Sequence, residues 1–501
     1  MTDEEPLSIP TLFGLLSILF VATRWYNLKD DLEHIPTVGY SNPILSYITA
    51  IKFFFYADDI IGEGYRKYKP GIFKIPTLLS WKVVAVGTDL VEDIRKAPES
   101  VLSFEEAILD IVQTDYTMGP EIQHNPYHVP IIRTQLTKNL AIVFPQMRDE
   151  LVSAFTDAIP TVADEWVKVH ATPAIQTIAC RVTNRVFVGL PLCRNEDYQK
   201  LNIQFTVDVI IGARIINWFP KFLKPIAGRL FTRVHSQTRR VISHLGPIIE
   251  ERQRMLDEHD DDWDGKPKDL LTWIMDEARG EERSISNLTR RIMVVNVAAV
   301  HTTSLSFLQI LYRVAAHPEY MKPLRDEVET VVTAEGWTKA SMNKLVKIDS
   351  FIRESQRMDG LGSLSMSRVA VKPFTFSNGV TIPAGPTVYC APFATHHDED
   401  LYEDPRTFKP FRFAELREGN DDSSKHQIVT TNPEFLTFGY GRYACPGRFF
   451  VANELKCMLA HVVLNYDVKF EDGQDGYPPN RMIESVCAPA DVNVLFRKRN
   501  V

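Results

Sequence analysis

The sequence has few cysteines and none of the closely spaced pairs that mark disulfide-rich or zinc-binding proteins. Its six cysteines are spread over 501 residues without a C-x-x-C motif: Cys180, Cys193, Cys390, Cys445, Cys457 and Cys487. Both a disulfide framework and a structural zinc site are therefore disfavoured. This usage is typical of a chain whose body faces a reducing compartment.

Basic clusters are also lacking. The chain carries 56 basic and 64 acidic residues, a net charge of −8, and no basic block interleaved with aromatic residues. Nucleic acid is therefore not an expected partner, and lipophilic or neutral molecules fit better. No G-x-G-x-x-G fingerprint is present either, so the chain offers no flavin or nicotinamide site of its own. The composition, 45% hydrophobic and 24% charged, is that of a compact globular protein, which we expect to be a monomer.

One long uncharged run stands at the N-terminus. Eighteen uncharged residues separate Glu5 from Arg24, just enough for a helix to cross a hydrocarbon core of about 30 Å. We interpret residues 1–24 as a transmembrane anchor, 25–50 as a linker near the membrane and 51–501 as the catalytic domain. The acidic start and the basic flank favour a cytosolic body. A cleaved signal peptide and a surface helix are the alternatives.

The body shows mostly helical patterns. Residues 286–317 form a long helical pattern that is apolar on most faces, and Pro318 stops it, so this helix is expected to cross the middle of the fold. Residues 372–377 and 380–382 flank Asn378-Gly379, which predicts a hairpin with a type I′ turn, and residues 387–393 are β-like. The fold class is therefore mainly α with a small β-sheet region.

The segment FGYGRYACPG, residues 438–447, places Cys445 in a glycine-containing loop directly before a helical pattern. Pro446 suits the first helical position. Unpaired N–H groups at the helix start would favour a thiolate over a thiol. Gly441 and Gly447 would let the backbone approach a flat ligand. A buried free cysteine is the plain alternative.

This loop resembles the cysteine loop of the cytochrome P450 superfamily, F-x-x-G-x-(R/H)-x-C-x-G. Phe438, Gly441, Cys445 and Gly447 match, and the Arg/His position holds Tyr443. The resemblance implies the fold of that family, with a long central helix over haem b, and Cys445 as the axial ligand of the haem iron. In the family the basic side chain meets a haem propionate. Here that contact is lost, replaced by the Tyr443 phenol, or taken over by the neighbouring Arg442.

The motifs outside the loop are in register with this family. Glu354 and Arg357 are three residues apart on one predicted helix face, and Arg412 follows in FKPFRF. They resemble the family's E-x-x-R motif and second arginine, which implies a buried structural cluster that braces the haem loop. Arg368 matches a position that often binds a propionate, with a surface arginine as the alternative.

Two further segments resemble the family with departures. AAVHTT, residues 298–303, stands at the family's oxygen-activation motif: Thr302 matches its alcohol, and His301 replaces its acid. His301 either relays protons or only satisfies a carbonyl or a water. Nearer the N-terminus, His128 and Arg133 stand where many members have W-x-x-x-R, which implies propionate contacts there.

The resemblance also implies a substrate pocket over the haem. We expect its lining to include Val295, Ala298 and Ala299 of the long helix, Leu364 in the 360–365 loop, and parts of residues 103–115. Residues 207–225 are apolar enough to touch a membrane, although core packing explains them equally well.

Together these features predict a haem-thiolate monooxygenase that oxidises a hydrophobic small molecule with O2. The similarity to fungal microsomal members related to ent-kaurene oxidase suggests a terpenoid or other secondary-metabolite intermediate. Electrons would come from an NADPH-cytochrome P450 reductase, with or without cytochrome b5, and the reductase would dock at Arg442, Arg448 and Lys456. The expected location is the endoplasmic reticulum membrane. A reductase-independent isomerase or dehydratase and a non-enzymatic haem sensor or carrier are the alternatives.

Overall fold

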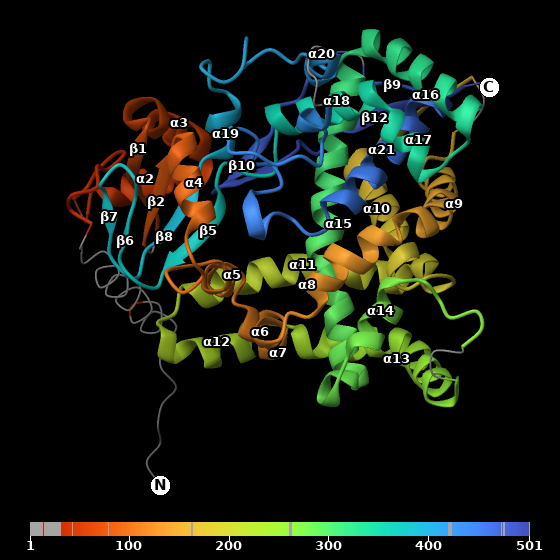
Figure 1. Cartoon of the computed structure of the whole chain (residues 1–501), viewed down its shortest axis with the longest axis horizontal. Coiled ribbons are helices and arrows are strands. Elements are labelled where there is room, and N and C mark those ends of the chain that lie inside the picture. The colour runs from red at the N-terminus through yellow and green to blue at the C-terminus, as the bar shows by residue number, and fades with distance from the viewer. Residues whose placement is uncertain are drawn as a thin grey trace.

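Helices make up most of the chain, and a small sheet region lies at one side of them (Figure 1). The computed structural model describes residues 14, 32–42, 44–78, 80–161, 164–259, 263–418, 423–471, 473 and 476–499. The mainly helical fold with a small sheet is as predicted. The predicted anchor, residues 1–24, lies outside the described residues apart from Gly14.

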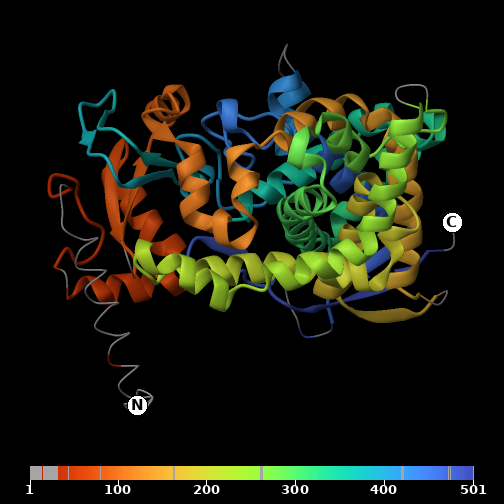
Figure 2. The same ribbon diagram turned by 90° about the horizontal axis from the view of Figure 1, so that it is seen from below.

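The longer helices of the described chain surround one central helix, α15, which Figure 2 shows nearly end-on. They are α2 Ser46–Phe55, α3 Ala57–Tyr68, α4 Thr88–Lys96, α5 Phe104–Val112, α9 Leu140–Ala158, α10 Ala171–Phe187, α11 Glu196–Asn217, α12 Lys224–Phe231, α13 Val234–His259, α14 Leu270–Glu277, α15 Ile285–Ala316, α16 Met321–Glu335, α18 Val346–Met358 and α21 Arg448–Asn465. The shorter ones are α6 Thr114–Thr117, α7 Pro120–His124, α8 His128–Ile131, α17 Lys339–Lys344, α19 Pro392–His396 and α20 Arg412–Glu418.

The largest described sheet has the strand order β1-β2-β8-β5-β3, with β2 and β8 parallel and the other pairs antiparallel. Its strands are β1 Gly71–Pro76, β2 Trp81–Val86, β3 Leu102–Ser103, β5 Ser365–Ala370 and β8 Thr387–Cys390. Smaller sheets combine β4 Trp166–His170, β12 Asn493–Lys498 and β9 Tyr466–Lys469; β10 Arg481–Ile483 and β11 Val486–Ala488; and β6 Phe374–Thr375 and β7 Thr381–Ile382.

The predicted hairpin forms, but its turn differs from the prediction. Only Gly379 has a positive φ, 84°, whereas a type I′ turn needs positive φ at both central residues. The Gly379 N–H donates to the Phe376 carbonyl, and the Phe376 N–H donates to the Val380 carbonyl. The turn is therefore a type I turn followed by a glycine in the left-handed conformation, so Asn378 does not adopt that conformation.

The long central helix α15 matches the predicted pattern closely. The Ser284 side chain caps its start by accepting from the Asn287 N–H, and the helix ends at Ala316 before His317 and Pro318. Most of its side chains are buried, including Phe307, which belongs to the main apolar core. In the described part of the chain it is the one helix long and apolar enough to cross a membrane. Because it is mostly buried within the protein, it is a core helix.

The sheet separates two smaller apolar clusters. Val83 and Ala85 of β2 face one cluster, whereas Val84 and Val86 face the other, as the alternation of a strand requires. Leu32 and Ile35 are buried in the first cluster, and Val38 in the second. The described part of the segment expected as a linker is therefore packed onto the sheet.

Candidate active site

Cys445 lies in a tight loop directly before α21. Its N–H donates to the Phe438 carbonyl at 2.8 Å. The helix begins at Arg448 with Gly447 as its N-cap, so Pro446 precedes the helix and does not occupy the first helical position predicted for it. Gly441 has a φ of 78°, and a Cβ there would collide with the Arg95 side chain.

The surroundings of Cys445 have opposite effects on the pKa of its thiol. Cys445 is half-buried, whereas the other five cysteines are buried. Burial raises the pKa of the Cys445 thiol, and the N–H groups of Gly447 and Arg448 and the Arg448 guanidinium lower it without overcoming the burial. The N–H groups at the helix start therefore act in the predicted direction, toward the thiolate, but in the protein chain by itself burial outweighs them. The positive charge of a bound metal ion would shift this balance to the thiolate.

The Tyr443 phenol points at a carboxylate. It donates to Glu99, and the neighbouring Arg442 donates to the same phenol and lies 3.9 Å from Glu99. The Tyr443 ring stacks on Phe104 of α5, with centroids 4.8 Å apart. Glu99 also accepts from the Ser103 hydroxyl at 2.7 Å. At this loop position the structure thus provides a protein carboxylate as the partner of both side chains.

The middle of α15 presents an accessible face although the helix is otherwise buried. Ala298 and Thr302 are exposed and Ala299 is half-buried, while Val295 is buried in the main core. The Thr302 hydroxyl donates to the Ala298 carbonyl at 2.7 Å. Of the predicted pocket residues on α15, Ala298 and Ala299 are therefore accessible, whereas Val295 is packed into the core.

His301 faces a neighbouring helix. One of its ring nitrogens lies 2.9 Å from the Ile203 carbonyl of α11, and burial lowers the pKa of the imidazole. Because a carbonyl only accepts, the nitrogen that meets it carries the proton. Of the two roles considered from the sequence, this geometry matches the histidine that satisfies a carbonyl.

Arg368 is a buried cation with few protein partners. It is 3% exposed and donates to the carbonyl of the adjacent Ser367 at 2.8 Å. Its guanidinium lies over the Phe104 and Tyr443 rings, and burial lowers its pKa. No described carboxylate forms an ion pair with it, so an anionic ligand group would complete its surroundings.

His128 and Arg133 lie on two successive helical segments. A π-helical segment, Ile132–Leu136, follows α8 and accommodates a spacing of five residues between them. His128 is buried, and its Nδ1 accepts from the fully buried Arg291 of α15 at 3.1 Å. Burial lowers the pKa of His128 to about 4, so the ring is neutral with its proton on Nε2. Arg133 is exposed and donates to the Arg442 carbonyl at 3.1 Å.

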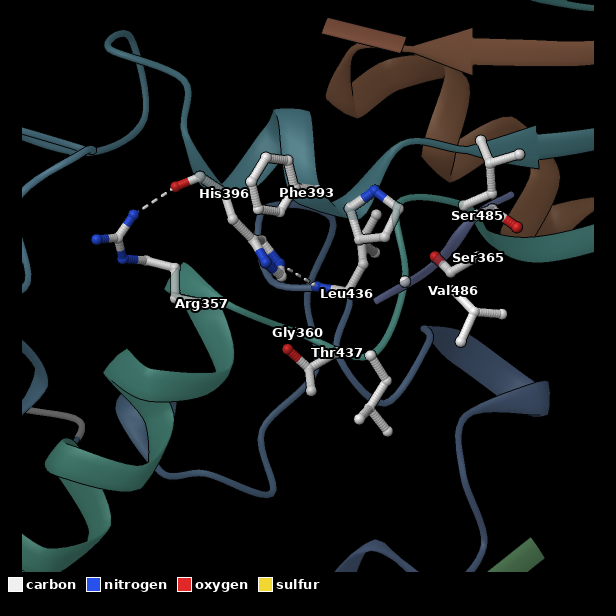
Figure 3. A pocket seen from close by; sticks show the side chains of 13 residues that line it. Arg357, Gly360, Ser365, Phe393, His396, Leu436, Thr437, Ser485 and Val486 are labelled. Atoms are coloured by element: carbon white, nitrogen blue, oxygen red, sulfur yellow. Dashed lines mark hydrogen bonds between the residues drawn. The ribbon is translucent and has the colours of Figure 1, made fainter. Parts of the chain in front are cut away.

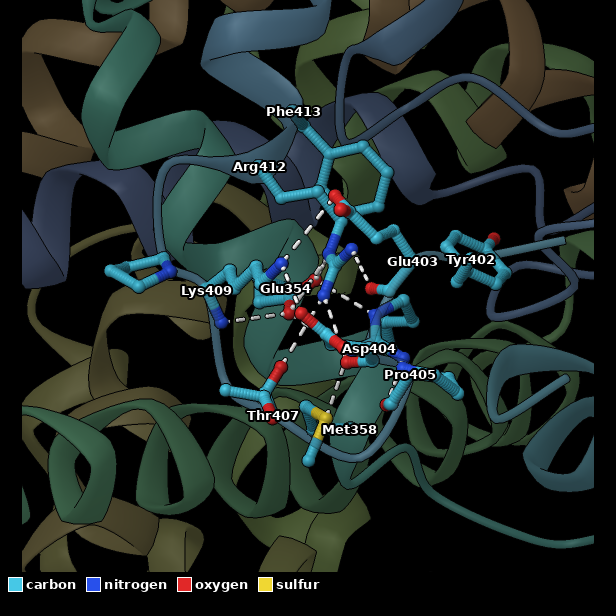
Figure 4. Close-up of polar contacts among 12 residues, drawn as sticks. Glu354, Met358, Tyr402, Glu403, Asp404, Pro405, Thr407, Lys409, Arg412 and Phe413 are labelled. Carbon is cyan, nitrogen blue, oxygen red and sulfur yellow. Dashed lines mark hydrogen bonds and ion pairs between the residues drawn. The ribbon is translucent and has the colours of Figure 1, made fainter. Parts of the chain in front are cut away.

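Glu354, Arg357 and Arg412 lie together in the interior, and Figure 4 shows Glu354 beside Arg412. Two parallel 2.8 Å hydrogen bonds join Arg357 to Glu354, and Arg412 Nε lies 3.2 Å from both carboxylate oxygens. Glu354 and Arg357 are fully buried and Arg412 is 7% exposed. A carboxylate that meets two guanidiniums in this geometry is well satisfied, and removing it would leave two buried cations unpaired.

A path of hydrogen bonds links this cluster to the cysteine loop. Arg357 donates to the His396 carbonyl at 2.6 Å, and the His396 Nε2 accepts from the Leu436 N–H at 3.0 Å, as Figure 3 shows. Burial holds the pKa of His396 well below its ordinary value, which keeps that nitrogen free to accept. Leu436 stands two residues before Phe438. A cavity of about 220 Å³ lies beside this path, lined in part by Leu364 of the predicted pocket loop.

These features fit a haem. The half-buried Cys445 supplies a sulfur ligand, and Arg368 is an under-satisfied buried cation of the kind that binds a propionate. The accessible face of α15 at Ala298 and Thr302 leaves room for a flat group. Arg368, His128 and Arg133 are the residues predicted to meet its carboxylates, and of these Arg368 and His128 are buried while Arg133 is exposed. The donor set therefore matches the cofactor that the cysteine loop implied.

The basic surface expected for a reductase differs from the prediction. Lys456 is 7% exposed and its Nζ pairs with Asp349 at 2.5 Å, so it is not available for docking. Arg448 is half-buried and donates to the Cys445 carbonyl at 3.0 Å. Arg442, with a side chain 64% exposed, and Arg133 remain as exposed cations beside the loop. Lys456 is buried because α21, which carries it, packs against α17 and α18.

Sequence reasoning missed the partners of several site residues. Glu99, which accepts a hydrogen bond from Tyr443, and Arg291, which donates one to His128, belong to no recognised motif. The sequence distance between partners, 344 residues for Tyr443 and Glu99 and 163 for His128 and Arg291, leaves no local pattern that would reveal them. A charged residue in an otherwise apolar helix, such as Arg291, is the one available signal.

Known proteins resemble this chain over its whole length. The family described as "Cytochrome P450" matches residues 81–496. "Cytochrome P450 monooxygenase 151" of Postia placenta is 43% identical over 502 residues, covering 100% of both chains. "Cytochrome P450 monooxygenase CYP512U6" of Ganoderma lucidum is 34% identical, covering 96% of this chain and 94% of its own. "Ent-kaurene oxidase" of Gibberella intermedia is 31% identical, covering 93% of this chain and 88% of its own. The chain that places Cys445 before α21 and Thr302 on the open face of α15 therefore belongs to the cytochrome P450 family, among its monooxygenases.

Proposed function

We propose that the protein holds haem b through Cys445 and oxidises a hydrophobic small molecule with O2. The observation that carries this proposal is the half-buried cysteine in a loop braced by the Glu354–Arg357–Arg412 cluster, together with the accessible face of α15. When bound, the haem supplies O2 activation and C–H oxidation, chemistry that no side chain provides.

The residues of the chain would hold and orient this chemistry. Cys445 would donate its thiolate to the iron, and Arg368 would neutralise a propionate. His128 would offer its Nε2–H as a neutral donor, because Arg291 occupies Nδ1. The Thr302 hydroxyl, bonded to its own helix, can rotate to donate toward the accessible face and hold a proton there. The small side chains of Ala298 and Ala299 leave space at that face.

The substrate is proposed to be a terpenoid or a related secondary-metabolite intermediate. The support is the similarity to a protein named "Ent-kaurene oxidase" at 31% identity. The predicted membrane association has support of its own in two groups of exposed apolar side chains, one on α2 and the residues just before it and one running from α11 through α12: Ile44, Leu45, Ile48, Ile51, Phe55, Ile210, Ile211, Trp218, Phe222, Ile226, Leu230 and Phe231. Glu484 joins the two groups, since its N–H donates to Phe54 and its carboxylate lies 3.8 Å from Arg214. This surface fits anchoring at the endoplasmic reticulum.

Thr302→Ala tests the role of the alcohol. The variant is expected to consume NADPH at a comparable rate but to form roughly tenfold less product per NADPH, because proton delivery at the accessible face loses its hydroxyl. Product and NADPH are measured together, with Thr303→Ala on the buried side of the helix as the matched control. Equal coupling in Thr302→Ala and the parent would contradict the role, and turnover without NADPH would indicate the isomerase alternative.

An NADPH-cytochrome P450 reductase is proposed to dock beside the loop at Arg442, whose side chain is 64% exposed. Arg442→Glu is expected to slow reduction by about tenfold at low ionic strength, with a smaller effect in high salt, because a rim charge acts mainly on encounter. The rate of CO-trapped reduction measures this, and the CO spectrum shows that the haem site is intact. Lys67→Glu on α3 makes the same charge change at an exposed site. Equal reduction rates for both variants would reject the footprint.

A further inference from the structure

Lys82 of β2 is an interior cation that the proposed chemistry does not use. It is half-buried, and its Nζ donates to the Tyr389 hydroxyl of β8 at 3.2 Å while lying 4.5 Å from the centre of that ring. No carboxylate of the described residues forms an ion pair with it. An ammonium has three N–H donors, so two remain for another partner.

The lysine stands on the face of the sheet that meets the pocket loop. Strand alternation puts it on the same face as Val84, whose apolar cluster includes Leu364. β8 separates β2 from β5, so the backbone of Lys82 lies roughly 10 Å from the strand that carries Arg368. Figure 1 shows α5, α11 and α12 on the side of the molecule below this sheet.

Several charges from separate elements surround Lys82. Burial lowers its pKa, but Tyr389, Glu484 and Asp110 outweigh the burial and leave the pKa raised, so the ammonium keeps its charge. Each of the two carboxylates already has another cation: Asp110 lies 4.0 Å from Lys224, and Glu484 lies 3.8 Å from Arg214. Neither of these carboxylates lies within ion-pair distance of Lys82.

We infer that Lys82, with the Tyr389 hydroxyl beside it, binds the carboxylate of an otherwise apolar acid, so that the substrates of the proposed monooxygenase include lipophilic monocarboxylic acids. The single negative charge of a carboxylate matches the single positive charge of the ammonium, which has no carboxylate partner among the described residues. A carboxylate accepts from the ammonium and from the phenol together, and such charge-assisted bonds are strong where water is partly excluded. The apolar part of such an acid would extend from the sheet toward the accessible face of α15.

The inference rests on the proposed function but is tested by binding alone. The haem-loaded protein, first checked by its CO spectrum, is titrated with dodecanoic acid and methyl dodecanoate, and with abietic acid and methyl abietate. The shift of the Soret band and equilibrium dialysis give the dissociation constants. The parent protein is expected to bind the acid of at least one pair about tenfold more tightly than its ester.

The variants assign that preference to the lysine. Lys82→Met is expected to lose the preference for the acid while binding the ester as the parent does, and Lys82→Arg is expected to keep it. Lys67→Met, an exposed lysine on α3, is the matched control and should behave as the parent. A parent protein that binds neither acid more tightly than its ester overturns the inference, as does a preference that persists in Lys82→Met. Failure of the monooxygenase proposal would instead appear as a missing thiolate CO spectrum or as absent NADPH-dependent product.

Discussion

Cys445→Ser is expected to abolish the red-shifted Soret band of the reduced, CO-treated protein and all NADPH-dependent product. A serine hydroxyl does not replace a thiolate as a strong electron donor to iron, so both the spectrum and O–O cleavage depend on this one sulfur. The CO difference spectrum and a product assay measure the two losses. Product formation is expected to fall to the background of the assay. This is the largest effect that we expect of any single substitution.

The control for this prediction is another cysteine. Cys193→Ala removes a buried thiol far from the loop and is expected to leave the band in place. A folded Cys445→Ser protein that retained the red-shifted band would mean that a different residue binds the iron. Circular dichroism of both variants separates that outcome from misfolding.

Glu354→Gln is expected to lower the free energy of unfolding by about 3–5 kcal/mol, because it leaves two buried guanidiniums without their anion. The side chain keeps its size, so the loss reports charge and hydrogen bonding. Urea unfolding followed by tryptophan fluorescence measures it. Glu258→Gln breaks an exposed 3.0 Å pair with Arg254 on α13 and is expected to cost less than about 1 kcal/mol. Equal losses in the two variants would contradict the structural role of the cluster.

Arg357→Lys distinguishes bracing of the loop from stability alone. Lysine keeps the positive charge, but its three donors on one nitrogen cannot replace the four hydrogen bonds that the planar guanidinium makes to Glu354, His396 and Pro405. The variant is therefore expected to lose haem more readily than its smaller fall in stability would explain. Haem transfer to an excess of apomyoglobin measures the retention. Unchanged haem retention would show that the path through His396 does not hold the loop.

The motifs that were local in sequence could be predicted because local geometry decides them. The i,i+3 spacing of Glu354 and Arg357 puts both on one helix face in any context. The same holds for the long apolar pattern of α15 and for Pro318, which follows its end. The hairpin at Asn378-Gly379 was located correctly, but its turn type was not, since only Gly379 takes a left-handed conformation.

Side chains whose role depends on a distant partner could not be predicted in the same way. Lys456 belongs to a helix with the expected position, yet packing against α17 and α18 buries it beside Asp349. His301 follows the accessible Ala298 by three residues, but its ring turns to the Ile203 carbonyl of α11. Whether a helix face is buried depends on which elements pack against it. Those elements are distant in sequence, so no short segment contains this information.

The sequence by itself determined the cysteine, the alcohol, the glutamate with its two arginines and the helices that carry them. Periodicity, capping and motif spacing are properties of neighbouring residues, so they can be recognised before the chain is folded. Only the tertiary structure decided that Tyr443 meets Glu99, that Arg291 holds His128 and that Lys82 keeps an unpartnered charge. Those contacts depend on which side chains the packing of distant segments brings together and which it leaves without a partner. They matter because a buried charge without a partner is costly.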